Sequence, residues 1–481
     1  MLDDWARVRE PPVRCGVPGE IEQIPASRAV KQLNGYMSLG RAEYLLRRRL
    51  PLTTNNLSCS KRQWAAVGIA SVSALATLNG YRPLSNSGTS SVLSFASGLV
   101  TTELPLQSLA LEAGLLGLLA RATPPRARWA AGLLWAAGCL GRFGLNRAGR
   151  GAEESLSEAL DEGLGPARCT DVHNLWARPL ADGGTAKQSG LVRMMRVYRD
   201  YVHEADIQYG PYGRANHLDI WRRPDLDRTG RAPVLVQIPG GAWSTGNKRG
   251  QAHPLMSHLA ELGWICVSIN YRLSPRNTWP EQIIDVKRAI AWVKSHIIDY
   301  GGDPDFVAVT GGSAGGHLSA LAALTADDSR LQPGFEDADT TVQAAIPFYG
   351  VYDFTRTDSA LHPIMVPFLE RLVVKRRRRD VPDVYAAASP MTHISPDAPP
   401  FFVLHGRNDS FIPVEQARSF VHRLRAVSRQ QVAYAELPFA QHAFDIFGSA
   451  RARHAAAAVG QFLAEIYSRQ SVYGEVCPCG S

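Results

Sequence analysis

Cysteine is scarce in this sequence, with seven residues in 481 positions. The number is odd and most of the cysteines stand in apolar surroundings, so a disulfide-stapled scaffold is excluded and reduced thiols are expected. Cys477 and Cys479 lie close together at the C-terminus, but no second pair of metal ligands lies near them. We therefore expect no metal site there.

A secretory signal is also missing from the start of the sequence. The first residues, MLDDWARVRE, place acids and a tryptophan where such a signal has a basic stretch followed by an apolar run. A cytoplasmic location is therefore expected, with association to a membrane or the cell envelope left open by the apolar segment described next.

Acidic residues are nearly absent from residues 61–150, which hold nine Lys and Arg against Glu103 and Glu112. This local excess of +7 accounts for most of the formal net charge of +8. Residues 191–481 carry 31 positive and 29 negative side chains and offer no basic field for nucleic acid. Nucleic acid is thus excluded as a partner.

Long, strongly apolar runs are missing too. Three shorter apolar stretches follow one another at residues 63–81, 104–120 and 129–141. The first is diluted by Ser, Thr and Asn, and the last is only about 13 residues long, whereas a membrane-spanning helix needs about 20. Arginines crowd a Pro-Pro turn between the second and third stretches, which predicts a helical hairpin with a basic elbow. These arginines are Arg121, Arg126 and Arg128.

Two interpretations of residues 61–150 remain open. The apolar helices either pack on themselves as a helical domain or contact a membrane surface. Around this region we expect an N-terminal arm at residues 1–60, and a helix and linker at 151–189 that includes an amphipathic helix over 152–164. The Gly-rich stretch 181–190 marks the predicted domain boundary.

From about Val202 onward, short β-type runs alternate with helical patterns, which is typical of βαβ units and a mostly parallel sheet. The predicted β runs are Ala205 to Tyr209, His217 to Trp221, Val234 to Ile238, Ile265 to Tyr271, Phe306 to Thr310, Ala344 to Tyr349, Phe401 to Leu404 and Val432 to Leu437. An insertion at 351–398 separates two of these runs and predicts a cap, and residues 471–481 form a tail.

The segment FVAVTGGSAGGHLSALAAL carries the strongest chemical signal. A β run stops at Gly-Gly-Ser-Ala-Gly and continues directly as a helical pattern, which indicates a nucleophile elbow with Ser313 at its tip. The turn is so tight that the flanking positions need glycine. A bare Gly-x-Ser-x-Gly match is weak, but its place between a strand and a helix makes it specific.

A serine hydroxyl needs an imidazole to take its proton and an acid to orient that imidazole. Asp409 follows one downstream β run and His442 follows the last, which gives the chain order Ser, Asp, His of this fold class. Three other residues were weighed for these roles, namely His317, His405 and Asp445. We expect the two histidines to have packing roles. Asp445 follows His442 too closely to reach the far imidazole nitrogen.

Backbone amides must also stabilise the oxyanion of the tetrahedral intermediate. The Ala314 amide is one expected donor, because it follows Ser313 at the start of the helix. The others are expected from the loop after the third β run, Pro-Gly-Gly-Ala-Trp at 239–243, with Gly240 and Gly241 as donors.

These motifs resemble the hormone-sensitive-lipase-like branch of the α/β-hydrolases, and more narrowly the actinobacterial Lip-type carboxylesterases. The resemblance covers residues 190–470, with PGGAW at 239–243, YRLSP at 271–275, YGGDPDFVAVTGGSAGG at 300–316 and HGRNDSFIP at 405–413. It implies serine-dependent ester hydrolysis without a cofactor, an oxyanion hole at Gly240, Gly241 and Ala314, and a lid. The branch pattern His-Gly-Gly-Gly-Trp is altered here, because Pro239 replaces the His and Ala242 replaces the third Gly. Ala242 is not expected to take a positive φ easily.

The sequence therefore predicts an α/β-hydrolase fold with an inserted cap and an N-terminal apolar helical region. The expected activity is hydrolysis of short to medium-chain carboxyl esters through an acyl-enzyme, with Trp243 binding substrate. Apolar residues of the insertion are expected to line the acyl pocket, namely Phe354, Met365, Phe368 and Leu372. The alternatives are a membrane-associated lipase for longer chains, an acyltransferase, and a non-catalytic membrane-binding protein.

Overall fold

The computed structural model of this protein describes residues 54–165 and 200–472, except residues 87, 89, 327, 357, 359 and 360. Most of the predicted N-terminal arm, the predicted boundary at 181–190, and the terminal Cys477 and Cys479 lie outside the described residues.

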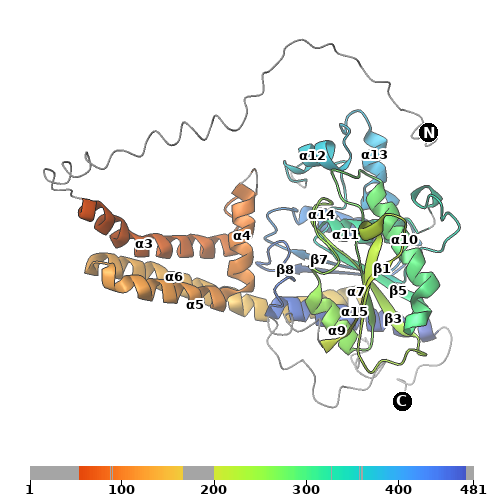
Figure 1. Ribbon diagram of the computed structural model, residues 1–481, viewed down its shortest axis with the longest axis horizontal. Coiled ribbons are helices and arrows are strands. Elements are labelled where there is room, and N and C mark those ends of the chain that lie inside the picture. The colour runs from red at the N-terminus through yellow and green to blue at the C-terminus, as the bar shows by residue number, and fades with distance from the viewer. Residues whose placement is uncertain are drawn as a thin grey trace, which may run out of the picture. The chain divides into compact units, whose positions relative to one another are not determined.

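An eight-stranded sheet forms the centre of the C-terminal part, in the order β1-β2-β4-β3-β5-β6-β7-β8 (Figure 1). The strands are β1 Val202–Gln208, β2 His217–Arg222, β3 Ala232–Ile238, β4 Ile265–Ile269, β5 Gly302–Gly312, β6 Ala344–Phe348, β7 Phe401–Gly406 and β8 Val432–Leu437. Strand β2 pairs antiparallel with β1 and β4, and every other pair in the sheet is parallel. The predicted mostly parallel sheet of an α/β-hydrolase is confirmed, and each predicted β run contributes a strand.

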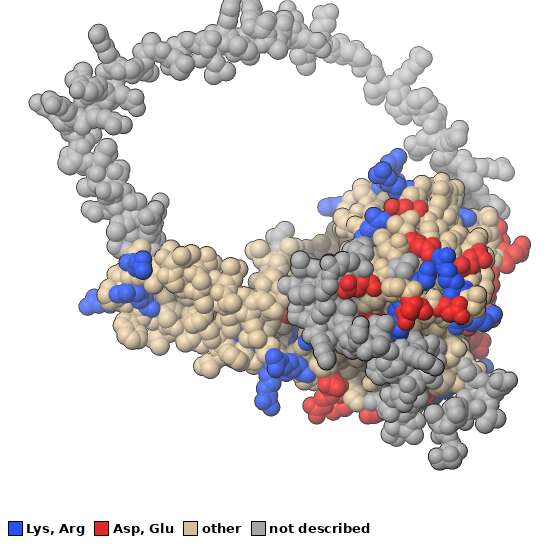
Figure 2. Space-filling view, turned by 60° about the horizontal axis from the view of Figure 1, so that its bottom comes forward, with Lys and Arg blue, Asp and Glu red and all other residues tan. Residues whose placement is uncertain are grey.

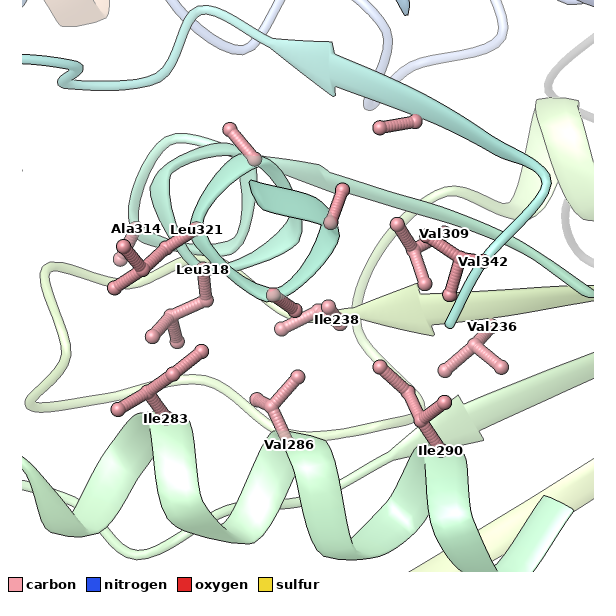
Figure 3. Packing of buried hydrophobic residues seen from close by; sticks show 14 of the residues in the cluster. Val236, Ile238, Ile283, Val286, Ile290, Val309, Ala314, Leu318, Leu321 and Val342 are labelled. Carbon is pink, nitrogen blue, oxygen red and sulfur yellow. The ribbon is translucent and has the colours of Figure 1, made fainter. Parts of the chain in front are cut away.

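Helices cover both faces of this sheet. One face carries α10 Glu281–His296, α11 Ala314–Leu324 and α14 Glu415–Val427, and the other carries α7 Ala152–Leu164, α9 His253–Glu261 and α15 Ala450–Val472. Strand β3 is buried throughout and serves both layers, because Val236 and Ile238 point into the first core and Leu235 into the second. Figure 3 shows the first core, with Ile283 and Ile290 of α10 facing β3. Burial of each such side chain contributes about 1.5–3 kcal/mol.

Helix α7 coincides with the amphipathic helix predicted over 152–164. Its buried residues, including Leu156 and Leu160, belong to the same core as α9 and α15. A Cβ on Gly163 would lie 2.5 Å from the Cα of Ala433, so α7 packs tightly against β8. Helix α7 is thus part of the layered α/β structure.

The apolar segment before α7 is helical in the structure. It contains α3 Thr54–Tyr81, α4 Ser90–Glu103, α5 Pro105–Leu119, the short η2 Ala120–Ala122 and α6 Pro125–Arg150. Helix α6 begins at the second proline of the Pro-Pro turn, since proline at the first helical position costs no hydrogen bond. Among the described helices, none is by itself long and apolar enough to cross a bilayer, whereas the bent pair of α4 with residues 105–122 meets both criteria together.

The insertion at 351–398 lies between β6 and β7 and forms only short helices. These are α12 Met365–Phe368, the π-helical η8 Leu369–Val373, α13 Pro382–Ala387 and η9 Pro390–His393. The insertion is tied to the body of the fold by the amide of Trp279, which donates to the carbonyl of Val373 at 2.9 Å.

Candidate active site

Ser313 occupies the turn between β5 and α11, where the sequence predicts the nucleophile elbow. Its backbone has φ 59° and ψ −119°, a strained conformation for a residue with a Cβ. The conformation is held on both sides, because the Ser313 amide donates to the Phe348 carbonyl at 3.0 Å and the Ser313 carbonyl accepts from the His317 amide at 2.9 Å. Ser313 is half-buried, and its hydroxyl has no hydrogen-bond partner among the described residues.

Glycines make this turn possible. A Cβ on Gly311 would lie 2.5 Å from the carbonyl oxygen of Ile238, and one on Gly315 would lie 2.1 Å from the same atom. Both distances are well below any real Cβ contact, so β3, the turn and the first turn of α11 can approach only without side chains there. The Gly-x-Ser-x-Gly spacing is therefore a packing requirement of this turn.

Asp409 and His442 meet in the structure. His442 Nδ1 lies 2.6 Å from Asp409 Oδ2. The other carboxylate oxygen, Oδ1, accepts from the amides of Phe411 and Ile412, each at 2.8 Å. Burial by itself would raise the pKa of Asp409, but His442 and His405 outweigh it and hold that pKa well below its usual range. Asp409 is therefore a fixed anion that orients the His442 ring.

Three aromatic rings surround His442, which is only 7 % exposed. The ring centroid of Tyr349 lies 4.6 Å from that of His442, and the centroids of Phe411 and Phe95 lie at 5.7 Å and 6.1 Å. Tyr349 also reaches the elbow, because a Cβ on Gly312 would lie 2.5 Å from the Tyr349 hydroxyl. The structure thus joins His442 directly to Asp409, and to the Ser313 turn through Tyr349.

The predicted oxyanion loop after β3 differs from expectation at Gly240. Its amide donates to Gln251 Oε1 at 2.7 Å, while Gln251 Nε2 donates to the Gly240 carbonyl at 3.3 Å. Neither the Gly241 amide nor the Ala242 amide has an acceptor among the described residues. Ala242 has φ 51°, so it adopts the left-handed conformation. This differs from the expectation that an alanine at this position would not take a positive φ easily. Gly241 and Ala242 therefore present free amides, and Gly240 is held by a side chain.

Trp243 is the last residue of this loop, and its side chain packs against the elbow helix. The residue is 2 % exposed, and its Nε1 donates to His317 Nδ1 at 3.1 Å. His317 in turn stacks on Phe354 of the insertion, with ring centroids 4.7 Å apart. The Trp243 ring is therefore packed between the elbow helix and the insertion, and its predicted contact with substrate stays a prediction.

His317 and His405, the alternative candidates for the catalytic imidazole, have packing roles. His317 Nε2 donates to the Ala388 carbonyl at 2.7 Å, and burial lowers the pKa of His317 to about 4. His405 Nε2 lies 2.9 Å from the Ile412 carbonyl oxygen and 3.4 Å from Asp409 Oδ2, beneath the acid loop. Asp445 accepts from the Tyr349 hydroxyl, and its pKa is raised by burial. The structure places Asp409, and not Asp445, against the imidazole.

Sequence reasoning missed four residues that position the site, namely Phe95, Gln251, Tyr349 and Gln441. Gln441 Oε1 accepts from the Ser410 amide at 2.7 Å and from the His442 amide at 2.9 Å, and so links the acid and histidine loops. Gln251 and Gln441 both bind main-chain atoms, and contacts of this kind leave no pattern in the sequence. The sequence gives no direct signal for Gln251 beyond the departure of Pro239 from the resembled branch pattern.

Known proteins are similar to this chain over most of its length. A probable carboxylic ester hydrolase of Mycobacterium tuberculosis, LipM, is 65 % identical over 417 residues, which are 87 % of this chain and 96 % of LipM. Esterase LipQ of the same organism is 53 % identical over 69 % of this chain and 79 % of its own length. The BD-FAE family model matches residues 218–424. Among solved structures, a truncated carbohydrate esterase from gut microbiota covers 56 % of this chain and 98 % of its own, with 24 % identity and a TM-score of 0.49.

Proposed function

The chain belongs to the Lip-type carboxylic ester hydrolases, and from this membership we propose that it hydrolyses carboxyl esters with Ser313 as the nucleophile. The observation that carries the proposal is the pair of Asp409 and His442, joined at 2.6 Å, together with a serine in a strained turn that Tyr349 links to the imidazole. Asp409 fixes the imidazole tautomer, with the proton on Nδ1, so Nε2 is free to accept the Ser313 proton.

The reaction has two halves. His442 takes the Ser313 proton as Oγ attacks the ester carbonyl, and it then gives that proton to the leaving alcohol. Water, deprotonated by the same imidazole, attacks the acyl-enzyme and releases the acid. The residues need no cofactor for either half.

Backbone amides stabilise the negative oxygen in both halves. The Ala314 amide starts α11 and has no acceptor within its helix, so it and the positive end of the helix dipole are available beside Ser313. The Gly241 and Ala242 amides supply the remaining donors, because the Gly240 amide already donates to Gln251. Each donor contributes about 3–4 kcal/mol to transition-state stabilisation.

The acyl chain of the substrate is proposed to be short to medium in length. The insertion contacts the elbow helix through Phe354, which is buried and stacks on His317. Met365, Phe368 and Leu372 of the insertion are half-buried and pack against the same hydrophobic core. A half-buried apolar wall offers contact to a limited number of methylene groups.

A fluorophosphonate probe tests this proposal. It reacts with an activated serine and is expected to label Ser313, as read by mass spectrometry of the digested protein. The Ser313→Ala variant is expected to lose both labelling and hydrolysis. Ser319, a buried serine six residues along on α11, supplies the matched control Ser319→Ala. A label on any other serine would refute the assignment.

The apolar helices favour a second proposal, that the enzyme works at a membrane surface. Of the 19 large hydrophobic residues that are exposed in the described chain, 16 fall within residues 64–143. Their exposed fractions lie between 40 % and 80 % and are largest at Leu118, Leu140 and Trp129. Exposed apolar area on this scale marks an interaction surface.

Beside a small apolar cluster around Ala66, Ala70 and Ala131, the interior of the same helices buries charged and polar side chains. Arg142 is 1 % exposed and pairs with Glu112 at 2.8 Å, and Ser73 Oγ donates to Glu112 at 2.6 Å. Small residues make the close contacts, as at Gly141, where a Cβ would lie 2.4 Å from the Thr77 methyl. Polar and small residues inside with apolar residues outside is the arrangement found in lipid.

The charge at the end of these helices fits an anionic lipid surface. Arg121, Arg126 and Arg128 are exposed around the turn between α5 and α6, and the acids of this region, Glu103 and Glu112, are both engaged in ion pairs. Figure 2 shows Lys and Arg at the end of the helices and largely uncharged residues along them. Each Lys or Arg near an anionic membrane contributes about 1 kcal/mol to binding. We therefore propose an anionic bilayer as the occupant of this face.

Co-sedimentation tests the membrane proposal. The full chain is expected to sediment with vesicles of phosphatidylglycerol and phosphatidylcholine, and less with pure phosphatidylcholine. Leu118→Glu with Trp129→Glu should abolish binding, and Arg126→Glu with Arg128→Glu should weaken it. The control Arg371→Glu with Arg379→Glu changes exposed arginines of the insertion and should bind normally. Equal binding to vesicles by all variants would contradict the proposal. So would a second result: the wild type self-associates without vesicles, and both pairs of helix substitutions disrupt that self-association.

A further inference from the structure

Helix α4 contacts both loops that carry the acid and the imidazole, although it lies more than 300 positions earlier in the chain. Gly98 faces Gln441, and a Cβ there would lie 3.1 Å from Gln441 Nε2. Ser410 Oγ lies 3.5 Å from the carbonyl oxygen of Ser91. The residue that links the two catalytic loops, Gln441, therefore rests directly on α4.

Both ends of α4 are anchored to the hydrolase fold. At its C-terminal end, Glu103 pairs with Arg451 of α15 and accepts from Ser449 Oγ at 2.7 Å, in a buried position. At its N-terminal end, Ser91 contacts Ser410, and at the C-terminal end of the preceding helix α3, Asn408 Nδ2 donates to the carbonyls of Gly80 and Tyr81, each at 2.9 Å. A buried ion pair with a missing partner is costly, so α4 is held in place.

Phe95 is the residue of α4 that reaches the imidazole. Its ring centroid lies 4.6 Å from that of Phe411 and 6.1 Å from that of His442, with an edge-on angle of 69° to His442. Phe95 and Phe411 are both half-buried, so each keeps an open face. They form an apolar rim beside His442.

The chemistry decides which part of the ester meets this rim. His442 must deliver a proton to the leaving alcohol oxygen, so that oxygen lies within hydrogen-bond reach of the ring. In the proposed mechanism the carbonyl oxygen faces the amides of Gly241, Ala242 and Ala314, and the alkoxy group is a separate substituent of the same carbon that is directed to the imidazole. The group attached to the alcohol oxygen therefore lies next to Phe95.

We infer that Phe95 is a specificity-determining residue that contacts the hydrocarbon of the leaving alcohol and limits its size. The inference rests on the proposed function of Ser313 and His442. It means that a helix of the apolar N-terminal region completes the substrate site, so alcohols with long alkyl chains reach the imidazole only past this ring. One methylene group in a hydrophobic pocket changes kcat/KM by about 10-fold to 200-fold.

Two series of esters test the inference on the full chain. Methyl, butyl and octyl butyrate vary the alcohol at a constant acyl group, and methyl acetate, butyrate and octanoate vary the acyl group at a constant alcohol. The butyrate esters form the same butyryl-enzyme, so any difference among them arises before the alcohol leaves. Phe95→Ala is expected to raise the octyl-to-methyl ratio of kcat/KM about tenfold and to leave the acyl series unchanged.

Ile298→Ala is the matched control, because Ile298 is an exposed apolar residue that lies outside the apolar helices and outside the candidate site. It is expected to match the wild type in both series. Phe95→Leu keeps an apolar side chain and is expected to shift the alcohol ratio in the same direction by less, which covers the case in which Phe95→Ala does not fold. Equal changes for all alcohols, or a change confined to the acyl series, overturn the inference.

Fluorophosphonate labelling of the same preparations distinguishes failure of the Phe95 inference from failure of the proposed function. If Ser313 is labelled in the wild type and Phe95→Ala leaves the alcohol profile unchanged, the inference on Phe95 fails alone. If hydrolysis survives Ser313→Ala, the proposed function itself fails.

Discussion

Gln251 binds both main-chain polar groups of Gly240, accepting from its amide at 2.7 Å and donating to its carbonyl at 3.3 Å. This clamp fixes the loop in which Gly241 has φ 126° and Ala242 has φ 51°. A Cβ on Gly240 would lie 2.3 Å from the Gly312 carbonyl oxygen, so the clamped residue also packs on the elbow. Gln251, 11 positions away, thereby holds a loop in which Pro239 stands at the histidine position of the resembled branch pattern.

Removal of the clamp should slow catalysis more than it weakens binding. Gln251→Ala frees the Gly240 amide and lets the loop move, so the Gly241 and Ala242 amides lose their alignment. We expect kcat to fall by about 10²-fold with KM nearly unchanged, the size of effect that follows loss of one oxyanion donor. Steady-state kinetics on butyl butyrate measures this. Gln430→Ala, at an exposed glutamine, should behave as the wild type, and a rise in KM alone would contradict the role of Gln251.

The two buried carboxylates near His442 should respond very differently to amidation. Asp409→Asn cannot keep the proton on His442 Nδ1, because the amide offers its own N–H, and kcat should fall about 10⁴-fold. Asp445→Asn keeps a hydrogen-bond acceptor for the Tyr349 hydroxyl and should retain most of the activity. A larger loss in Asp445→Asn than in Asp409→Asn would reverse the assignment of the acid.

His317 should make the fold sensitive to mild acid. Burial lowers its pKa to about 4 in the folded protein, whereas the unfolded chain has an ordinary imidazole pKa of about 6.5. Between these values the unfolded state binds more protons, so the free energy of unfolding decreases as pH falls from about 6.5 toward 4, by roughly 3 kcal/mol at most. Above about pH 6.5 this contribution is fully present.

Denaturant unfolding at several pH values measures the effect. In His317→Gln the free energy of unfolding should depend less on pH between about 6.5 and 4. The difference in unfolding free energy between wild type and variant should therefore become smaller as pH falls. His422→Gln, at an exposed position of α14, should keep the wild-type dependence. Parallel curves for wild type and His317→Gln would be inconsistent with a neutral buried imidazole.

The sheet and the proposed catalytic residues could be predicted because their signals are local. Alternating and continuous apolar runs mark the strands, and the glycines of the elbow are required by contacts within a few residues of Ser313. Helix α11 begins directly after Ser313 of the Gly-Gly-Ser-Ala-Gly turn, where the sequence predicts a helical pattern, for the same reason. Asp409 and His442 were found because each follows a β run at the same edge of the sheet.

Long-range contacts could not be predicted from the sequence. Phe95 and Gln251 act on the site through packing and main-chain hydrogen bonds, and neither type of contact changes the local pattern. One signal was present at Glu103. A single acid among apolar residues implies a buried partner, and that partner is Arg451, 348 positions later. The position of α4 could therefore be inferred only with the structure.

The contact of α4 with the catalytic loops should be sensitive to a small side chain added at Gly98. Gly98 lies in α4 with Asn79 Nδ2 3.0 Å and Gln441 Nε2 3.1 Å from the position of a Cβ, so Gly98→Val must displace Gln441. Because Gln441 Oε1 holds the amides of Ser410 and His442, we expect the imidazole to shift and kcat to fall about tenfold or more, the cost of a small misplacement.

Gly114→Val on α5 is the matched control, since nothing lies within 4 Å of its Cβ position. Both variants replace a helical glycine, so a shared change in stability reflects helix propensity. Loss of kcat in Gly98→Val alone, with fluorophosphonate labelling slowed to the same degree, is the expected result. Equal kinetics in the two variants would mean that α4 does not position the catalytic loops.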